Sequence, residues 1–174
     1  MTTTSTSTTV LATATATQTP PAEPEVYGYQ PSGANSLDLR YRCNKFGFYS
    51  FPTILDLKLA LVGGDLFSET GFAQNSPLGT WRAVASSEGD VYVSYTANPG
   101  WIITEVHWDM GCADTIDTAR VCNPSQYVYS QSGLNTGAAL NLGPVRYPTC
   151  NTGSEQDYLI VNAKLARVIS VTEQ

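Results

Sequence analysis

The chain has 174 residues, only 14% of them charged, and its formal net charge is −6. Because this charge is negative and no cluster of Lys and Arg offsets it, a nucleic-acid partner is excluded. No stretch approaches the roughly 18 apolar residues of a membrane span, so no membrane span is predicted. The low charged fraction, with plentiful Gly, Ser, Thr and Tyr, favours an extracellular β protein over a cytosolic helical one.

Residues 1–25 are rich in Thr and Ser and end in a Pro-containing segment. Such sequence has too few large apolar residues to order itself, so we expect a disordered stalk. Its composition is that of a mucin-like segment, and an unmodified flexible tail is the alternative. The O-glycan candidates are Thr13, Thr15, Thr17 and Thr19.

The N-terminus has no basic residue before position 20, and its only apolar run is Val10-Leu11-Ala12, so no signal peptide is predicted. An extracellular location therefore requires that Met1 is an added start on a processed or excised fragment. If Met1 is the natural start, secretion uses another route or the cysteines are free thiols.

Residues 26–174 are expected to form a single domain, and the first predicted strand in it spans residues 53–62. Alternate positions there are leucine, which is the pattern of a half-buried strand. These positions are Leu55, Leu57, Leu59 and Leu61. Gly63-Gly64 ends the strand. Residues 63–79 are turn-rich, with room for one short turn of helix within 64–74.

Residues 90–96 and 101–110 have the next two strand patterns, separated by the turn Asn98-Pro99-Gly100. Val91, Val93 and Tyr95 share one face of the first run. Two strands separated by a short turn predict a β-hairpin.

Residues 126–130 predict a short aromatic strand, and residues 157–168 a long strand late in the chain. Segments 111–126 and 131–156 are turn-rich. We therefore expect an all-β domain of five to nine strands, an antiparallel β-sandwich or alternatively a small β-barrel. One face of the long strand carries Leu159, Val161, Ala163 and Leu165.

The four cysteines form no C-x-x-C pair, and their spacings with the single histidine do not fit a zinc site. An even number in this composition predicts two disulfides made in an oxidising compartment. Three pairings are possible. The favoured one joins Cys112 to Cys122 and Cys43 to Cys150.

Glu105, His107 and Asp109 alternate along the 101–110 strand, so all three are expected on one face. The opposite face, with Ile102, Val106, Trp108 and Met110, is expected to be buried. A carboxylate–imidazole–carboxylate row is a candidate metal or acid–base site. The alternative is that these side chains hydrogen-bond neighbouring strands or loops, and no cofactor is then required.

A catalytic role has little support in the sequence. No G-x-S-x-G motif occurs, and one histidine among many serines identifies no nucleophile. Glu105 and Asp109 should be about 13 Å apart at Cα, which is too far for a glycosidase pair. Asp114 and Asp117 lie in an acidic stretch without Lys or Arg and are candidate calcium ligands, a solvated acidic surface being the alternative.

Tyrosines lie among Ser, Asn, Gln and Gly along the chain, as they do on surfaces that stack against sugars. Tyr92, Tyr127 and Tyr129 are the candidates for glycan contact. The alternative is that these tyrosines fill the core and favour strands.

One part of the chain, about residues 90–170, resembles a module of secreted bacterial and fungal surface proteins. In that module an aromatic strand leads into W-x-I-x-E-x-H-x-x-x-G, then a Pro-containing Q-Y-x-Y segment, then a late strand with Y-x-I. This sequence departs from the pattern at Asn162-Ala163-Lys164, where a histidine is expected. The resemblance implies a secreted β-sandwich of no established activity. The matching residues are Trp101, Ile103, Glu105, His107, Gly111, Pro124, Gln126, Tyr127, Tyr129, Tyr158 and Ile160.

The first functional hypothesis is a non-catalytic structural or adhesive module at the cell surface that associates with itself. It could form filaments, with the arm at residues 25–29 added to a neighbour's sheet edge. The second hypothesis is a carbohydrate-binding domain for cell-wall or extracellular glycans. The third is a secreted hydrolase using Glu105 or Asp109.

Overall fold

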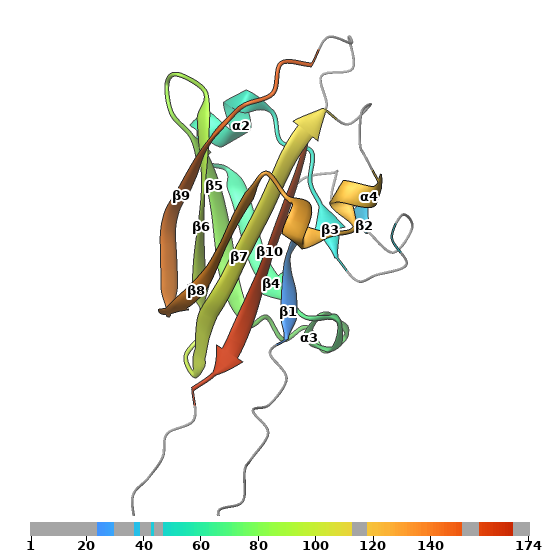
Figure 1. Ribbon diagram of the computed structural model, residues 1–174, viewed down its shortest axis with the longest axis vertical. Helices are drawn as coiled ribbons and strands as arrows, with labels where there is room; N and C mark the ends of the chain where they lie inside the picture. Colours follow the sequence, from blue (N-terminus) through green and yellow to red (C-terminus); the bar gives the residue numbers. More distant parts are fainter. Residues whose placement is uncertain are drawn as a thin grey trace, which may run out of the picture.

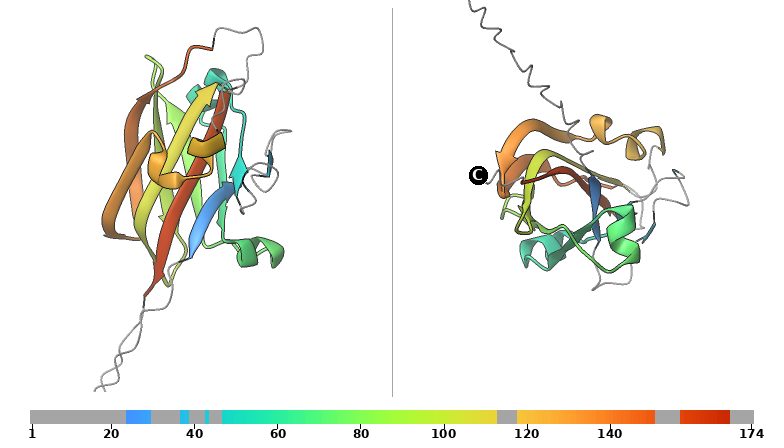
Figure 2. Two further views of the ribbon diagram at one scale, coloured as in Figure 1. Left: turned by 45° about the vertical axis from the view of Figure 1, so that its right-hand side comes forward. Right: turned by 90° about the horizontal axis from the view of Figure 1, so that it is seen from below.

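The computed structural model describes residues 24–29, 37–38, 43, 47–112, 118–150 and 157–168. Ten strands lie in this part of the chain, in an eight-stranded antiparallel sheet and a two-stranded one. The eight-stranded sheet curls into a nearly closed barrel (Figure 1; Figure 2). The all-β, disulfide-linked class is therefore confirmed, and the barrel alternative describes the architecture better than two separate sheets.

The large sheet has the strand order β8-β7-β10-β1-β4-β5-β6-β9. Strands β8 and β9 are its edges, and they run apart from the turn that joins them (Figure 1). The small sheet pairs β2 with β3. The strands are β1 (Glu25–Tyr29), β2 (Leu37–Asp38), β3 (Phe48–Tyr49), β4 (Val62–Phe67), β5 (Gly79–Ala85), β6 (Asp90–Ala97), β7 (Trp101–Cys112), β8 (Tyr129–Thr136), β9 (Ala138–Arg146) and β10 (Asp157–Arg167).

The helices are short and lie outside the barrel wall (Figure 2). One of them, α3, falls inside the 64–74 segment where a helical turn was predicted. Among the described residues, no helix has the length and apolar character needed to cross a membrane. The helices are α2 (Ile54–Lys58), α3 (Glu69–Ala73), α4 (Thr118–Val121) and the 3-10 helix η2 (Pro124–Gln126).

Within the described part of the chain, two apolar clusters hold the fold together. The larger fills the barrel, and the alternate residues predicted on β6 and β10 all point into it. The smaller cluster lies on the outer face of β1 and β10, beneath β3 and the α4–η2 segment. Burial of a large side chain stabilises the fold by about 1.5–3 kcal/mol. The smaller cluster consists of Tyr27, Phe48, Val121, Tyr127, Tyr158 and Ile160.

The predicted strand at residues 53–62 is wrong, because its first half forms helix α2. Thr53 and Asp56 form a capping box: Thr53 Oγ1 accepts from the Asp56 N–H at 3.1 Å, and Asp56 Oδ2 accepts from the Thr53 N–H at 2.9 Å. Capping of this kind satisfies backbone donors that a helix start leaves unpaired. Of the four leucines only Leu57 is buried, and the other three are about 60% exposed.

The predicted hairpin of β6 with β7 is also wrong. Strand β6 pairs with β5 and β9, whereas β7 pairs with β10 and β8. The turn at Asn98–Gly100 therefore joins two strands that do not pair with each other. The segments 63–79 and 131–156 were expected to be turns, but they contain β4, β8 and β9. These strands were not predicted because small, polar and glycine residues interrupt their apolar alternation.

Strand β7 has an irregularity that shifts its inner face by one residue. Lys164 lies opposite Glu105 but Leu165 lies opposite Ile103, so one extra residue, Thr104, is accommodated on β7. Ile103 is consequently the buried residue, and Ile102 is not. Val106, Trp108 and Met110 are buried in the barrel as predicted.

Two disulfides form, as predicted, but the favoured pairing is wrong. Cys43 is bonded to Cys122 and Cys112 to Cys150. Their sequence separations of 79 and 38 residues correspond to about 4.5 and about 4 kcal/mol of chain-entropy stabilisation. The first bond joins Cys43, which lies between β2 and β3 in the chain, to the residue that follows α4. The second ties the end of β7 to the segment that leads into β10.

The residues of the N-terminal stalk up to position 23, with Thr13, Thr15, Thr17 and Thr19, lie outside the described residues. The arm at residues 25–29 is strand β1. It pairs with β10 on one side and β4 on the other. It is therefore an internal strand of its own sheet.

Candidate functional site

The polar row Glu105, His107 and Asp109 lies on the outer face of β7, opposite the core residues of the same strand. Its neighbours come from the two strands that pair with β7. On one side Lys164 and Asn162 of β10 lie opposite Glu105 and His107. On the other side lie residues of β8. The row divides into two parts with different surroundings.

Asp109 is fully buried and is held by three neighbours. It accepts hydrogen bonds from the Arg120 guanidinium, the Tyr158 hydroxyl at 2.8 Å and the Val128 N–H at 3.1 Å. Arg120 belongs to α4, and Val128 lies just before β8. Because a buried carboxylate needs charged and hydrogen-bonding partners, this set anchors the α4–η2 segment across the sheet. Asp109 is therefore a structural ion-pair residue.

Glu105 and His107 form the second part, together with Ser130 of β8. Ser130 Oγ is 2.9 Å from His107 Nδ1, and His107 Nε2 is 3.2 Å from Glu105 Oε2. When the Ser130 hydroxyl donates to His107 Nδ1, the proton on Nε2 can be donated to the Glu105 carboxylate. The tautomer with its proton on Nε2 therefore satisfies both contacts. Ser130 is exposed, whereas His107 is 7% exposed.

Lys164 completes this cluster from β10. Its Nζ lies 2.8 Å from Glu105 Oε2. Hydrogen bonding from Lys164 lowers the pKa of Glu105, and the contact with His107 lowers it further. Glu105 is therefore an ionised carboxylate that orients the imidazole. The cluster Ser130, His107, Glu105 and Lys164 is called the outer polar cluster below.

The geometry of the outer polar cluster is that of a hydroxyl, a base and an orienting acid in series. The serine and the lysine were missed by sequence reasoning. Ser130 is the last residue of the predicted strand 126–130, and the rest of β8 was expected to be turn-rich. Lys164 lies 59 residues from Glu105 in the sequence. Only the register of β7 with β8 and β10 brings them together.

The structure places the candidate metal ligands and the candidate glycan-contact tyrosines in different surroundings. The proposed calcium ligands Asp114 and Asp117 lie outside the described residues. Among the described residues, no group of three metal-ligating side chains forms around His107. Tyr127 is 5% exposed, and its hydroxyl donates to the Val121 carbonyl, so its ring cannot stack on a sugar.

The other two tyrosine candidates are half-buried. Tyr129 lies nearly parallel to Trp108, with ring centroids 5.9 Å apart, so one of its faces is occupied. Tyr92 lies on β6, away from the Val91 and Val93 side. The glycan alternative therefore depends on Tyr92 and on the outer part of Tyr129.

Comparison of the chain with models of protein families, with curated proteins and with solved structures gives no match. The resemblance to a secreted surface module therefore stays a prediction.

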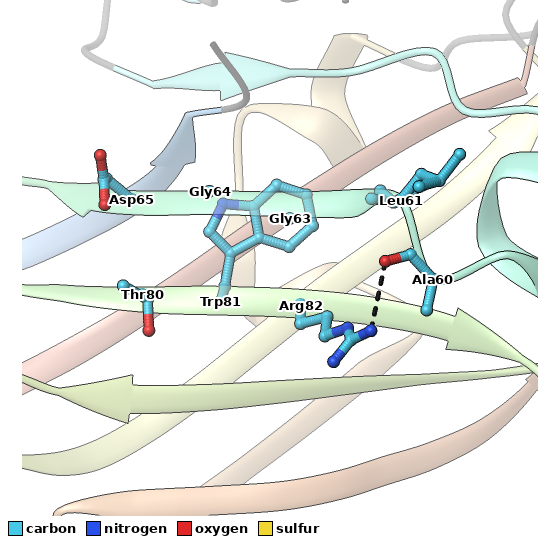
Figure 3. Close-up of a pocket in the computed structure, with 9 residues that line it drawn as sticks. Ala60, Leu61, Gly63, Gly64, Asp65, Thr80, Trp81 and Arg82 are labelled. Carbon is cyan, nitrogen blue, oxygen red and sulfur yellow. Dashed lines mark hydrogen bonds between the residues drawn. The ribbon is translucent and has the colours of Figure 1, made fainter. Parts of the chain in front are cut away.

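A shallow hollow of about 410 Å³ lies on another part of the wall, over β4 and β5 (Figure 3). Gly63 and Gly64 give it a bare floor, and the Arg82 guanidinium reaches across to the Ala60 carbonyl at 3.3 Å. A Cβ on Gly63 would lie 2.7 Å from the Trp81 carbonyl oxygen, so the strands approach closely only because this residue is glycine. None of the residues of the outer polar cluster lines this hollow.

Proposed function

We propose that this protein is a non-catalytic extracellular structural or adhesive module that associates with a second copy of itself through strand β8. Two disulfides support an oxidising compartment. The observation that carries the proposal is the edge of the large sheet at β8, which has neither a charged residue nor a proline.

Strand β8 has the properties of an edge that invites pairing. It is the last strand of the sheet on its side, and it has neither a charged residue nor a proline. Natural proteins protect such edges with charges, prolines or bulges. Strand β8 has one such bulge, where two extra residues interrupt its pairing with β7 between Ser132 and Thr136, so only the residues before the bulge lack protection. The regular stretch available to a partner is therefore Tyr129 to Ser132.

The other edge, β9, is better protected. It contains Pro144, which has no N–H to donate, and it ends in Arg146. Asn141 has a left-handed backbone, with φ of 52°, that breaks a flat strand. A single open edge favours a closed two-fold pair, in which one β8 lies antiparallel to the other. A filament needs a second interface in addition.

Self-association is tested by sedimentation equilibrium over a wide range of protein concentrations. We expect the wild-type chain to dimerise and Ser132→Lys to remain a monomer, because a lysine on the edge opposes strand pairing. The matched control is Thr96→Lys, which adds the same charge at an exposed position of the internal strand β6. Monomers alone at the highest wild-type concentration, or equal dimerisation of both variants, would contradict the proposal.

A second candidate function, a secreted hydrolase, is favoured by the hydroxyl–imidazole–carboxylate series of the outer polar cluster. In this function His107 takes the proton of Ser130 as the hydroxyl attacks, and Glu105 holds the imidazolium. The test is covalent labelling by a fluorophosphonate, with Ser132→Ala as the matched control. Labelling lost in Ser130→Ala and kept in the control supports a hydrolase. An unlabelled wild-type chain removes this candidate.

A further inference from the structure

The hollow over β4 and β5 has polar side chains at both ends of its glycine floor (Figure 3). Asp65 and Thr80 lie at one end, and Arg82 lies at the other, beside Leu61. In the sheet register Asp65 is opposite Thr80, and Gly63 is opposite Arg82. The two pairs are two residues apart along the strands, which is about 7 Å. The volume of about 410 Å³ falls within the range of small-molecule sites.

The two ends of the hollow have opposite hydrogen-bonding capacities. The carboxylate of Asp65 accepts hydrogen bonds, whereas the guanidinium of Arg82 only donates them. Arg82 uses one N–H group to reach the Ala60 carbonyl, and this contact holds its planar fork beside the hollow. Thr80 adds a hydroxyl that can donate and accept. Asp65 is half-buried, and Thr80 and Arg82 are exposed, so all three side chains are accessible to a ligand.

These groups indicate which class of ligand fits the hollow. A neutral sugar ring has hydroxyl groups around its edge, which can donate to Asp65 and accept from Arg82 at the same time. A simple anion would pair with Arg82 but meet the negative charge of Asp65. An apolar ligand would cover both charged groups without giving either a partner, which costs free energy. The net charge of −6 also opposes an acidic polysaccharide.

The apolar surface of the hollow fits the faces of such a ring. The C–H groups of a pyranose point above and below the ring, so they can lie on a floor without side chains. Leu61 is 61% exposed and lines the same end as Arg82. An apolar wall with a few polar groups is the usual composition of a ligand site. Because the hollow is shallow and open, it suits a unit within a longer chain.

We propose that the hollow over β4 and β5 binds one neutral sugar unit of a polysaccharide between Asp65 and Arg82. This place differs from the tyrosine candidates Tyr92 and Tyr129, neither of which lines the hollow. It is also separate from the self-association edge, because β7, β10 and β1 lie between β8 and β4 in the sheet. The inference therefore gives the chain a glycan ligand whether or not β8 pairs.

The experiment is affinity electrophoresis of the folded chain in native gels with and without a soluble polysaccharide. The neutral probes are a β-1,3-glucan, a xyloglucan and a galactomannan, and the acidic probe is polygalacturonate. We expect at least one neutral probe to retard the wild-type chain, and polygalacturonate to leave its mobility unchanged.

Two variants remove the polar groups at the two ends, Arg82→Ala and Asp65→Ala. Each should weaken binding of the neutral probe by about 10-fold or more, which is what a hydrogen bond to a charged group contributes. The matched control is Arg167→Ala, which removes an exposed guanidinium at the end of β10. It changes the net charge as Arg82→Ala does and should bind like the wild type.

The proposal is overturned if no neutral probe retards the wild type, or if both hollow variants bind as tightly as Arg167→Ala. Retardation by polygalacturonate alone would indicate an anion site and would overturn it as well. Circular dichroism checks the fold of each variant, and if one of the two unfolds, the other decides. A wild-type chain that is retarded but stays monomeric would support the glycan site and contradict only the pairing of β8.

Discussion

Replacement of Arg120 by methionine tests the role of the buried ion pair. Arg120 is partly exposed, whereas its partner Asp109 is completely buried. The variant keeps much of the apolar stem but leaves Asp109 as a buried charge without its cation. Removal of one partner of a buried pair costs about 3–5 kcal/mol. The hydrogen bonds from Tyr158 and Val128 remain, so we expect a loss at the lower end, about 3 kcal/mol.

The assay is equilibrium unfolding in urea with the disulfides intact. The matched control is Arg146→Met at the Arg146–Asp90 pair, whose side chains are 69% and 29% exposed. Such a surface pair contributes about 1 kcal/mol or less. The double variant Arg120→Met with Asp109→Asn should regain part of the loss, because the unpaired charge is gone. If the free energy of unfolding decreases equally in Arg120→Met and Arg146→Met, the Arg120–Asp109 pair does not act as a buried ion pair.

Three further predictions concern stability. Gly28→Ala should cost about 1–3 kcal/mol by overpacking, because its Cβ would lie 2.0 Å from a Val161 methyl, whereas Gly137→Ala faces open space and should cost far less. Leu57→Ala, at a fully buried side chain, should cost about 2–5 kcal/mol, and a similar loss for an exposed neighbour such as Leu55→Ala would contradict the assignment of α2. Because the pKa of Glu105 is lowered in the fold, its contribution to stability is present above the unfolded pKa and is lost as pH falls through the folded pKa. Glu105→Gln should therefore flatten the acid limb of a plot of unfolding free energy against pH.

Strand periodicity predicted which residues of β6 and β10 face the barrel interior. In β10 the alternation of Leu159, Val161, Ala163 and Leu165 spans a strand of eleven residues, and all four are buried. The leucines at 55–61 have the same alternation, yet α2 contains only five residues. One and a half turns of helix are too short for a period of 3.6 to be distinguished from a period of two. The capping residues Thr53 and Asp56 were the informative signal there.

The cysteine pairing depends on the order of strands in the sheet, which local patterns do not contain. Cys112 ends β7, and β10 begins at Asp157 directly opposite it. The segment with Cys150 must arrive at that point, so it meets Cys112. Proximity in sequence favoured Cys122 instead. The same limit explains the incorrect hairpin, since strands joined by a short turn need not pair when the sheet closes on itself.

The candidate site was predicted in part for the same reason. Alternation along β7 placed Glu105 and His107 on one face, because alternation is a property of the strand alone. Their partners Ser130 and Lys164 come from β8 and β10 and are chosen by register. The hydrogen-bond partners of His107 are therefore defined only when β7, β8 and β10 are aligned in the sheet.

Asp157 provides a last prediction, in which stability changes with pH in the direction opposite to that of Glu105. Burial raises the pKa of Asp157 in the fold. Its stabilising contribution is therefore complete below the unfolded pKa and is lost as pH rises through the folded pKa, where a buried charge must form. Asp157→Asn cannot ionise, so its stability relative to that of the wild type should increase as the pH rises from acid to neutral. Urea unfolding of the wild type and of Asp157→Asn from about pH 3 to about pH 7 measures this difference in unfolding free energy. The contributions of titrating groups present in both proteins, Tyr147 and Asp56 included, largely cancel. A difference that does not change with pH would show that Asp157 ionises alike in the folded and unfolded chain, and burial would then not raise its pKa.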